Sequence, residues 1–90
     1  PRIAVSLGSG AGIAEGDAQA DVLGAGYQYV AGPAAAANAV NVVIVRTGTA
    51  DAIKVGDAVA ALFNLPTSVV RVGTDVPLGA DVSVVLVKQP

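Results

Sequence analysis

The segment Ser6–Ala18, SLGSGAGIAEGDA, decides the fold class because it joins an extended stretch to a helical one through closely spaced glycines. The stretch before it, Arg2–Leu7, alternates apolar and polar residues, which predicts a strand. The stretch that overlaps its end, Ile13–Ala25, repeats small apolar residues at helical spacing, which predicts a helix. A strand that leads directly into a helix is the first half of a βαβ unit, so the segment predicts an α/β domain.

The glycines Gly8, Gly10 and Gly12 raise the question of a phosphate-binding turn. The dinucleotide fingerprint G-x-G-x-x-G fails, because Ile13 stands where the third glycine is needed and no acidic residue ends the next expected strand. A P-loop also fails, because no lysine follows the glycines. We therefore expect these glycines to supply positive φ and a close helix–strand approach. The alternative that stays open is an anion or polar ligand held by free N–H groups at Gly8–Gly12 and the helix start.

The rest of the chain alternates strands and helices in the same way. Val40–Arg46 is apolar on both faces, which predicts a central strand covered on both sides. A second helix is expected at about Ala50–Phe63, capped by Thr49 or Asp51, with an apolar stripe of Ala52, Val55, Val59 and Leu62 and with Ala58 beside it. Further strands are expected at Gln28–Ala31, Ser68–Val72 and Ala80–Lys88.

These elements predict one small α/β domain over residues 1–90. Their order is β-α-β-β-α-β-β, with two helices, a mixed sheet of four to five strands, and right-handed crossovers. Because the sequence begins at Pro1 rather than at Met, we expect it to be a piece of a longer protein.

Composition excludes several classes of function. The chain is 53% hydrophobic and 13% charged, which excludes a disordered polar tail. Its net charge is −2, and no basic run exists, so we expect neither nucleic-acid binding nor a cationic socket for an acidic ligand. The cationic residues are scattered at Arg2, Arg46, Lys54, Arg71 and Lys88.

The residues that most often carry catalysis are missing. The chain has no His and no Cys, so the commonest general base and the strongest nucleophile are absent, and soft metal ions lack ligands. The acidic group Glu15, Asp17 and Asp21 is interpreted as a solvated helix face rather than a site for a hard cation. We therefore expect no enzyme activity, no metal and no cofactor.

Five residues are candidate contacts for a ligand or partner: Ser9, Gly10, Tyr27, Tyr29 and Arg46. Arg46 follows the most apolar strand, and it is either a strand-end residue that reaches solvent or an anion contact. The two tyrosines either cover the edge of a core that lacks large side chains, or stack on a sugar ring or line a groove for a partner.

Five stretches of the chain carry a resemblance to a known family: VSLGSGAGIA (Val5–Ala14), GYQYV (Gly26–Val30), VVIVRTG (Val42–Gly48), AVAALFNLP (Ala58–Pro66) and ADVSVVLV (Ala80–Val87). Together they resemble the LytR C-terminal domain, a small domain of bacterial cell-envelope proteins. The likeness covers most of the chain, although Leu7 stands where that family usually has Asn.

The resemblance implies a non-catalytic accessory module. Domains of this family often follow a LytR–CpsA–Psr phosphotransferase or a single membrane anchor, so the resemblance implies an extracytoplasmic position and an anchor outside this chain. It implies binding to a cell-wall glycopolymer or an envelope protein. The Ala-rich, Lys-poor composition fits an actinobacterial source. Two alternatives stay open: self-association through a sheet edge, and binding of a small anionic ligand at Gly8–Gly12.

Overall fold

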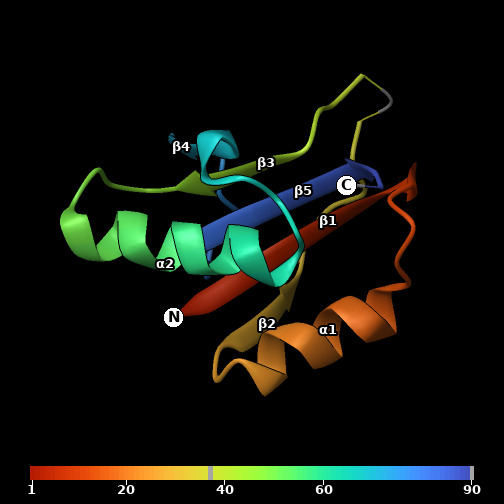
Figure 1. The fold of residues 1–90 in the computed structure, drawn as a ribbon, viewed down its shortest axis with the longest axis horizontal. Coiled ribbons are helices and arrows are strands. Elements are labelled where there is room, and N and C mark those ends of the chain that lie inside the picture. The colour runs from red at the N-terminus through yellow and green to blue at the C-terminus, as the bar shows by residue number, and fades with distance from the viewer. Residues whose placement is uncertain (37, 90) are drawn as a thin grey trace.

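Five strands form one mixed sheet in the computed structural model, which describes residues 1–36 and 38–89. The sheet has the order β2-β1-β5-β3-β4, so the last strand lies in the centre (Figure 1). Strand β1 is parallel to β2 and β5, whereas β3 is parallel to β4 and antiparallel to β5. The strands are β1 (Arg2–Gly10), β2 (Gln28–Ala31), β3 (Val42–Val45), β4 (Val70–Val72) and β5 (Val82–Lys88).

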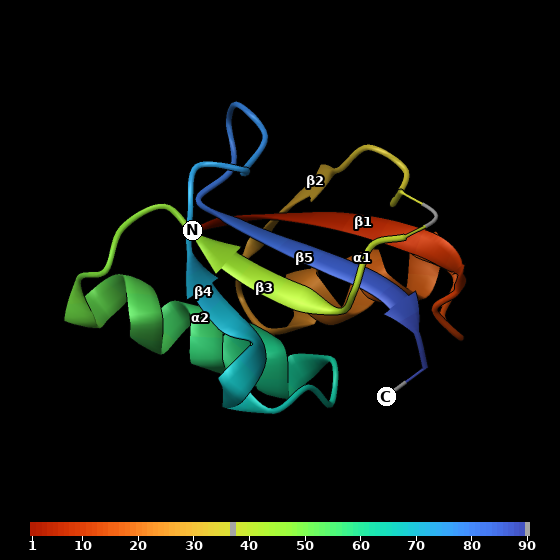
Figure 2. The same ribbon diagram turned by 90° about the horizontal axis from the view of Figure 1, so that it is seen from above.

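Two α-helices lie on the same face of this sheet. Helix α1 (Glu15–Gly24) connects β1 to β2, and helix α2 (Ala50–Leu62) connects β3 to η1 (Thr67–Val69), a 3-10 helix that leads into β4. Figures 1 and 2 show both helices on one side, in the arrangement of two right-handed crossovers that start from antiparallel strands. The predicted element order and the mixed sheet are confirmed.

The main core fills the space between the helices and the sheet. Alternate residues of the strands point toward the helices, as Ile3 and Val5 do in β1. Helix α1 contributes Ala18 and Val22, whereas Ala14 and Ala25, which flank the helix, are exposed. The other buried members are Ala11, Val43, Val45, Val59, Ala60, Phe63, Leu65, Val82, Val84 and Leu86.

The opposite face of the sheet is covered by connecting segments instead of helices. Segments 32–36 and 73–81 lie over this face (Figure 2). A second, smaller core forms there from Ala4, Val76 and Ala80. The prediction that Val40–Arg46 is a central strand buried on both faces is wrong: β3 is second from the edge, and it buries Val43 and Val45 while its other face stays partly exposed.

Side-chain hydrogen bonds explain where some elements begin and end. Thr49 caps α2, since its hydroxyl accepts a hydrogen bond from the Ala52 N–H at 3.2 Å. The side chain of Asn41 accepts from the N–H groups of Val87 and Lys88 at 2.8 and 3.0 Å and donates to the Lys88 carbonyl at 2.8 Å. It therefore replaces the backbone pairing with β5 that the expected strand from Val40 would have made.

The sequence pattern misplaced part of the buried face of α2. Ala58, expected beside the stripe, is exposed. The helix instead buries Gly56 and Ala60, and Phe63 is buried just beyond its end. A Cβ at Gly56 would lie 2.8 Å from Val45 Cγ1, so this glycine lets α2 approach the sheet closely.

Candidate binding site

The glycine segment is mostly strand, not a turn between strand and helix. Gly8 and Gly10 belong to β1, where the pairing with β5 shifts register between Leu7 and Gly10. A Cβ at Gly10 would lie 2.7 Å from the Val87 carbonyl oxygen, and one at Gly8 would lie 3.1 Å from Val87 Cγ1. The expected close approach is therefore between two strands rather than between helix and strand. Positive φ is confirmed for Gly12 alone of the three, at 75°.

Ser9 and Gly10 lie at the end of β1 that leads toward α1. Both are exposed, and Gly10 is opposite Lys88 in the register with β5. Helix α1 begins after Ala14, whose carbonyl accepts from the N–H groups of Asp17 and Ala18 at 3.1 and 3.0 Å. Ligand binding by Ser9, Gly10 or the neighbouring amides stays a prediction.

Arg46 lies directly after β3, at the end of the sheet opposite to Ser9 and Gly10. Its Nε donates to the Ala80 carbonyl at 2.8 Å, and its Nη2 donates to the carbonyls of Val76 and Pro77 at 3.1 and 2.8 Å. The side chain therefore holds segment 73–81 in place in addition to facing solvent. These three donated hydrogen bonds fix the orientation of the guanidinium, since its donors form a rigid fork.

The tyrosines lie beside α1. Both are partly buried and pack against the main core, as the structural interpretation predicted. The Tyr29 hydroxyl donates to Glu15 Oε1 at 3.2 Å. Burial, then the hydrogen bond to Glu15 and the charge of that carboxylate, raise the pKa of Tyr29 above 10.0. The five predicted contact residues thus lie in separate places and do not form one site.

A polar hollow of about 610 Å³ surrounds Arg46 and brings together residues that are far apart in the sequence. It lies where β1, β2 and β5 begin and where β3 ends, because β3 runs antiparallel to β5. We name it the Arg2–Arg46 hollow; its lining residues are Pro1, Arg2, Gly26, Gln28, Arg46, Gly79, Ala80 and Asp81. Two of the scattered cations, Arg2 and Arg46, thus line one hollow together with the acidic Asp81.

Hydrogen bonds order the polar side chains of this hollow. Arg2 Nε donates to Gln28 Oε1 at 2.8 Å, across the register that pairs these two residues. The Arg2 N–H donates to Asp81 Oδ2 at 2.8 Å, and the Asp81 N–H donates to the Arg2 carbonyl at 2.8 Å. Arg2, Gln28 and Asp81 were not predicted as site residues. A sequence signal existed, because Arg2 and Gln28 open the two strands of one predicted βαβ unit and so lie at the same edge.

A second hollow, of about 390 Å³, lies on the face of the sheet away from the helices. The hydroxyl-bearing residues Ser6 and Ser83 contribute to it with Val85, between the alanine-rich segment after Pro33 and the segment around Val76. Both serines are buried, at 5% and 3% exposure. Asp75 is the charged residue among its lining residues, so this hollow is more apolar than the Arg2–Arg46 hollow.

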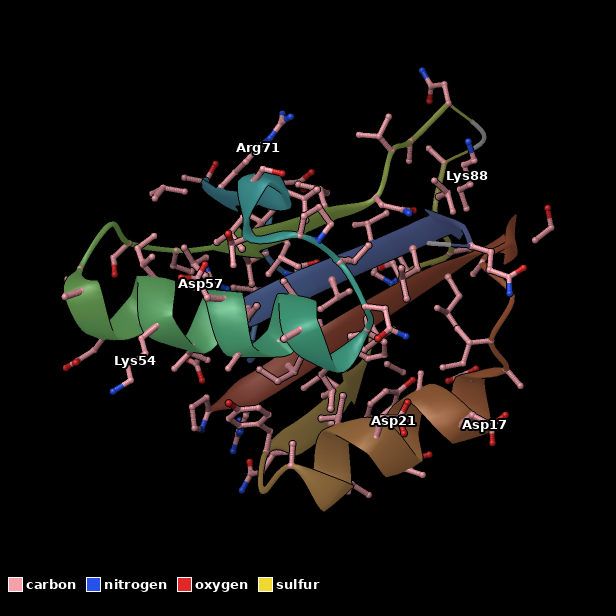
Figure 3. All side chains as sticks on the ribbon, viewed as in Figure 1. Asp17, Asp21, Lys54, Asp57, Arg71 and Lys88 are labelled. Carbon is pink, nitrogen blue, oxygen red and sulfur yellow. The ribbon has the colours of Figure 1, made fainter. Side chains whose placement is uncertain are left out.

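The acidic group on α1 is solvent-exposed, as predicted. Figure 3 shows Asp17 and Asp21 on this helix. Among residues 1–36 and 38–89, no three acidic, His or Cys side chains gather closely enough to hold a metal ion. In the same residues, no helix is long and apolar enough to cross a bilayer.

No protein-family model, curated protein or solved structure matches the chain.

Proposed function

We propose that this domain is a non-catalytic binding module of a bacterial cell-wall assembly protein, and that it binds a wall glycopolymer or an envelope protein. The proposal is supported by the resemblance of the segments Val5–Ala14, Gly26–Val30 and Ala80–Val87 to the LytR C-terminal domain. The lack of His and Cys favours binding over chemistry. In this proposal the domain lies outside the cytoplasm and is held at the membrane by a part of the protein beyond this chain.

The observation that carries the proposal is the ordered Arg2–Arg46 hollow. A binding site needs a concave surface with a few fixed polar groups. Here the Arg46 guanidinium is held by backbone carbonyls and the Arg2 guanidinium by Gln28, while the Asp81 carboxylate is held by the backbone N–H of Arg2. Groups that are fixed before binding lose less conformational entropy when a ligand arrives, which favours affinity.

Co-sedimentation with purified bacterial cell walls tests the proposal. The chain of residues 1–90 is mixed with isolated walls that still carry their attached glycopolymers, and with walls stripped of these polymers. We expect the domain to pellet with the intact walls and to stay in the supernatant with the stripped ones. Pelleting with both preparations would indicate a partner other than the glycopolymer. Pelleting with neither would contradict wall binding.

Self-association is the second candidate function, and it is favoured by the edges of the sheet. Within the described residues, β2 (Gln28–Ala31) and β4 (Val70–Val72) are each paired along one side only. Val72 on β4 is 54% exposed. An open edge with exposed apolar residues can pair with a second chain. Sedimentation velocity over a wide concentration range separates the candidates, because a concentration-independent monomer would exclude self-association.

A further inference from the structure

Two of the five cationic side chains of the protein lie at one hollow, although the net charge of the chain is −2. Arg2 opens β1 and Arg46 follows β3, and both line the Arg2–Arg46 hollow. Figure 3 shows the other three cations on separate parts of the surface: Lys54 on α2, Arg71 on β4 and Lys88 at the end of β5. Two positive charges therefore lie at the same end of the sheet, beside the carboxylate of Asp81.

Both guanidinium groups are held through Nε, which leaves terminal nitrogens for a ligand. Arg2 Nε is bonded to Gln28 and Arg46 Nε to the Ala80 carbonyl, each at 2.8 Å. Among the described residues, neither Nη atom of Arg2 and only Nη2 of Arg46 has a protein partner. Arg2 therefore keeps both Nη groups as paired donors for the two oxygens of a carboxylate or phosphate group, whereas Arg46 keeps Nη1 as a single donor group.

The walls of the hollow leave room beside the arginines. Gly26 and Gly79 line it with φ values of 90° and 86°, and no atom lies within 4 Å of a Cβ built at either glycine. Gly26 is fixed as glycine by the end of α1, where the Tyr27 N–H donates to the Val22 carbonyl at 3.2 Å. The backbone turns that close both segments therefore also keep side chains out of the hollow.

The hollow also holds acceptors, which narrows the class of ligand. Asp81 uses Oδ2 to accept from the Arg2 N–H, so its carboxylate stays at the hollow beside the two cations. A bare anion gains from the arginines and is repelled by this carboxylate. A ligand that carries hydroxyl groups next to its anionic group satisfies both, because hydroxyls donate to the Asp81 carboxylate and to the Gln28 carbonyl oxygen.

We propose that the Arg2–Arg46 hollow binds an anionic saccharide. The arginines hold its phosphate or carboxylate group, while Asp81 and Gln28 accept hydrogen bonds from its hydroxyls. This proposal rests on the proposed function, since it names the part of a wall glycopolymer that the domain would contact. The residues that would make the contact are far apart in the sequence, since Arg2 and Asp81 are separated by 79 positions.

Amide and arginine Nε–H NMR spectra of the chain test this assignment. Glucose 1-phosphate and glucuronate are titrated as the two anion sources, with glucose and inorganic phosphate as controls. We expect either anionic sugar to shift the Nε–H signals of Arg2 and Arg46 and the amides of Gly79 and Asp81. Glucose leaves them unshifted, and inorganic phosphate binds more weakly than the anionic sugar because it lacks sugar hydroxyls.

Arg2→Gln is the informative variant, because it keeps the Arg46 bonds to segment 73–81. It is expected to weaken binding of the anionic sugar by about tenfold, as the loss of a charged hydrogen-bonding partner does. The matched control Arg71→Gln removes the same charge from β4 and is expected to leave the affinity unchanged. Equal weakening by both variants, equal shifts with glucose, or shifts confined to Gly8–Ile13 would overturn the assignment.

The wall experiment separates this proposal from the function on which it rests. If the chain pellets with intact walls and Arg2→Gln pellets equally well, the domain binds walls at another place and the proposal fails alone. If the unchanged chain does not pellet with walls, the proposed function fails, whatever the sugar titration gives.

Discussion

At the scale of single residues, Gly16 and Gly56 are each followed by Asp and Ala in the sequence, but their surroundings in the fold differ. Gly16 lies in the first turn of α1, and Gly56 lies in the interior of α2, where glycine costs about 1 kcal/mol relative to alanine. No atom lies within 4 Å of a Cβ built at Gly16. A Cβ at Gly56 would lie 2.8 Å from Val45 Cγ1 and 2.9 Å from Val70 Cγ1. Helical propensity alone cannot tell these two positions apart, whereas the packing does.

The pair gives a matched test by substitution. Gly16→Ala is expected to raise the free energy of unfolding by about 0.5 kcal/mol, because it gains helical propensity without a clash. Gly56→Ala is expected to lower it by about 1–2 kcal/mol, because overpacking against β3 and β4 exceeds the gain in propensity. Urea denaturation of both variants measures the difference. Stabilisation by Gly56→Ala would contradict the close packing of α2 on the sheet.

The phenol of Tyr29 gives the domain a pH dependence in the alkaline range. Its folded pKa is raised above 10.0 by burial and by Glu15, so folding favours the neutral form. This contribution to stability is complete below pH 10.0 and is lost as the pH rises through the raised folded value. We expect the stability advantage of the unchanged chain over Tyr29→Phe to shrink as the pH rises above 10.0. A stability advantage that stays constant as the pH rises above 10.0 would contradict the raised pKa of Tyr29.

At the scale of elements, the side chains of Asn41 and Arg46 make hydrogen bonds that connect a strand to its neighbouring segment. Asn41 makes three hydrogen bonds to the backbone at Val87 and Lys88, and so extends the junction of β3 and β5 beyond the ladder itself. Arg46 does the same for segment 73–81 through three carbonyls. In both cases a side chain replaces backbone partners that the local geometry does not provide.

Replacement of Asn41 tests the first of these junctions. Asn41→Ala leaves two N–H groups and one carbonyl of β5 without their partner, so we expect a loss of about 1–3 kcal/mol in the free energy of unfolding. Asn38→Ala is the control, since Asn38 is exposed on the same connection and its side chain makes no hydrogen bond to the described residues. Chemical denaturation of both variants gives the comparison. Equal effects of the two would argue against the bridging role of Asn41.

Replacement of Arg46 tests the second junction. Arg46→Ala is expected to speed hydrogen exchange at the Ala80 amide, which is bonded to the Pro77 carbonyl at 3.1 Å. The loss of stability is about 1–2 kcal/mol, because the lost bonds are charged but partly exposed. Amides of α1 keep their exchange rates. Unchanged protection of the Ala80 amide would show that segment 73–81 keeps its structure without Arg46.

At the scale of the whole molecule, the sequence predicted the secondary-structure elements well, but it did not predict which strands lie next to each other in the sheet. Apolar periodicity located the five strands and the two α-helices of the described residues, because each of them buries one face or stripe, but it did not predict η1, which takes the start of the expected strand Ser68–Val72. The insertion of β5 between β1 and β3 was not predictable, since the order of strands depends on packing over the whole sheet. Strand ends moved for local reasons, as Asn41 shows at β3.

The candidate site depends on that strand order, which is why sequence spacing missed most of it. Arg46 was selected because it follows an apolar strand. Arg2 and Asp81 become its neighbours only because β1 and β5 begin where β3 ends. The glycine segment drew attention by its spacing, yet two of its three glycines serve the contact of β1 with Val87. Ser9 lies at the opposite end of β1 from this hollow.

Hydrogen exchange of the wall-bound chain tests most directly whether the Arg2–Arg46 hollow is the binding site. The chain is exchanged on intact cell walls and in free solution, and protection is compared along the sequence. Added protection at Arg2 and at Gly79–Val82, with none at the outer strand β2 beyond Gln28, is the predicted result. Added protection at Gly8–Ile13 or along Tyr29–Ala31 instead would contradict it, because the contact would then be the glycine segment or the sheet edge.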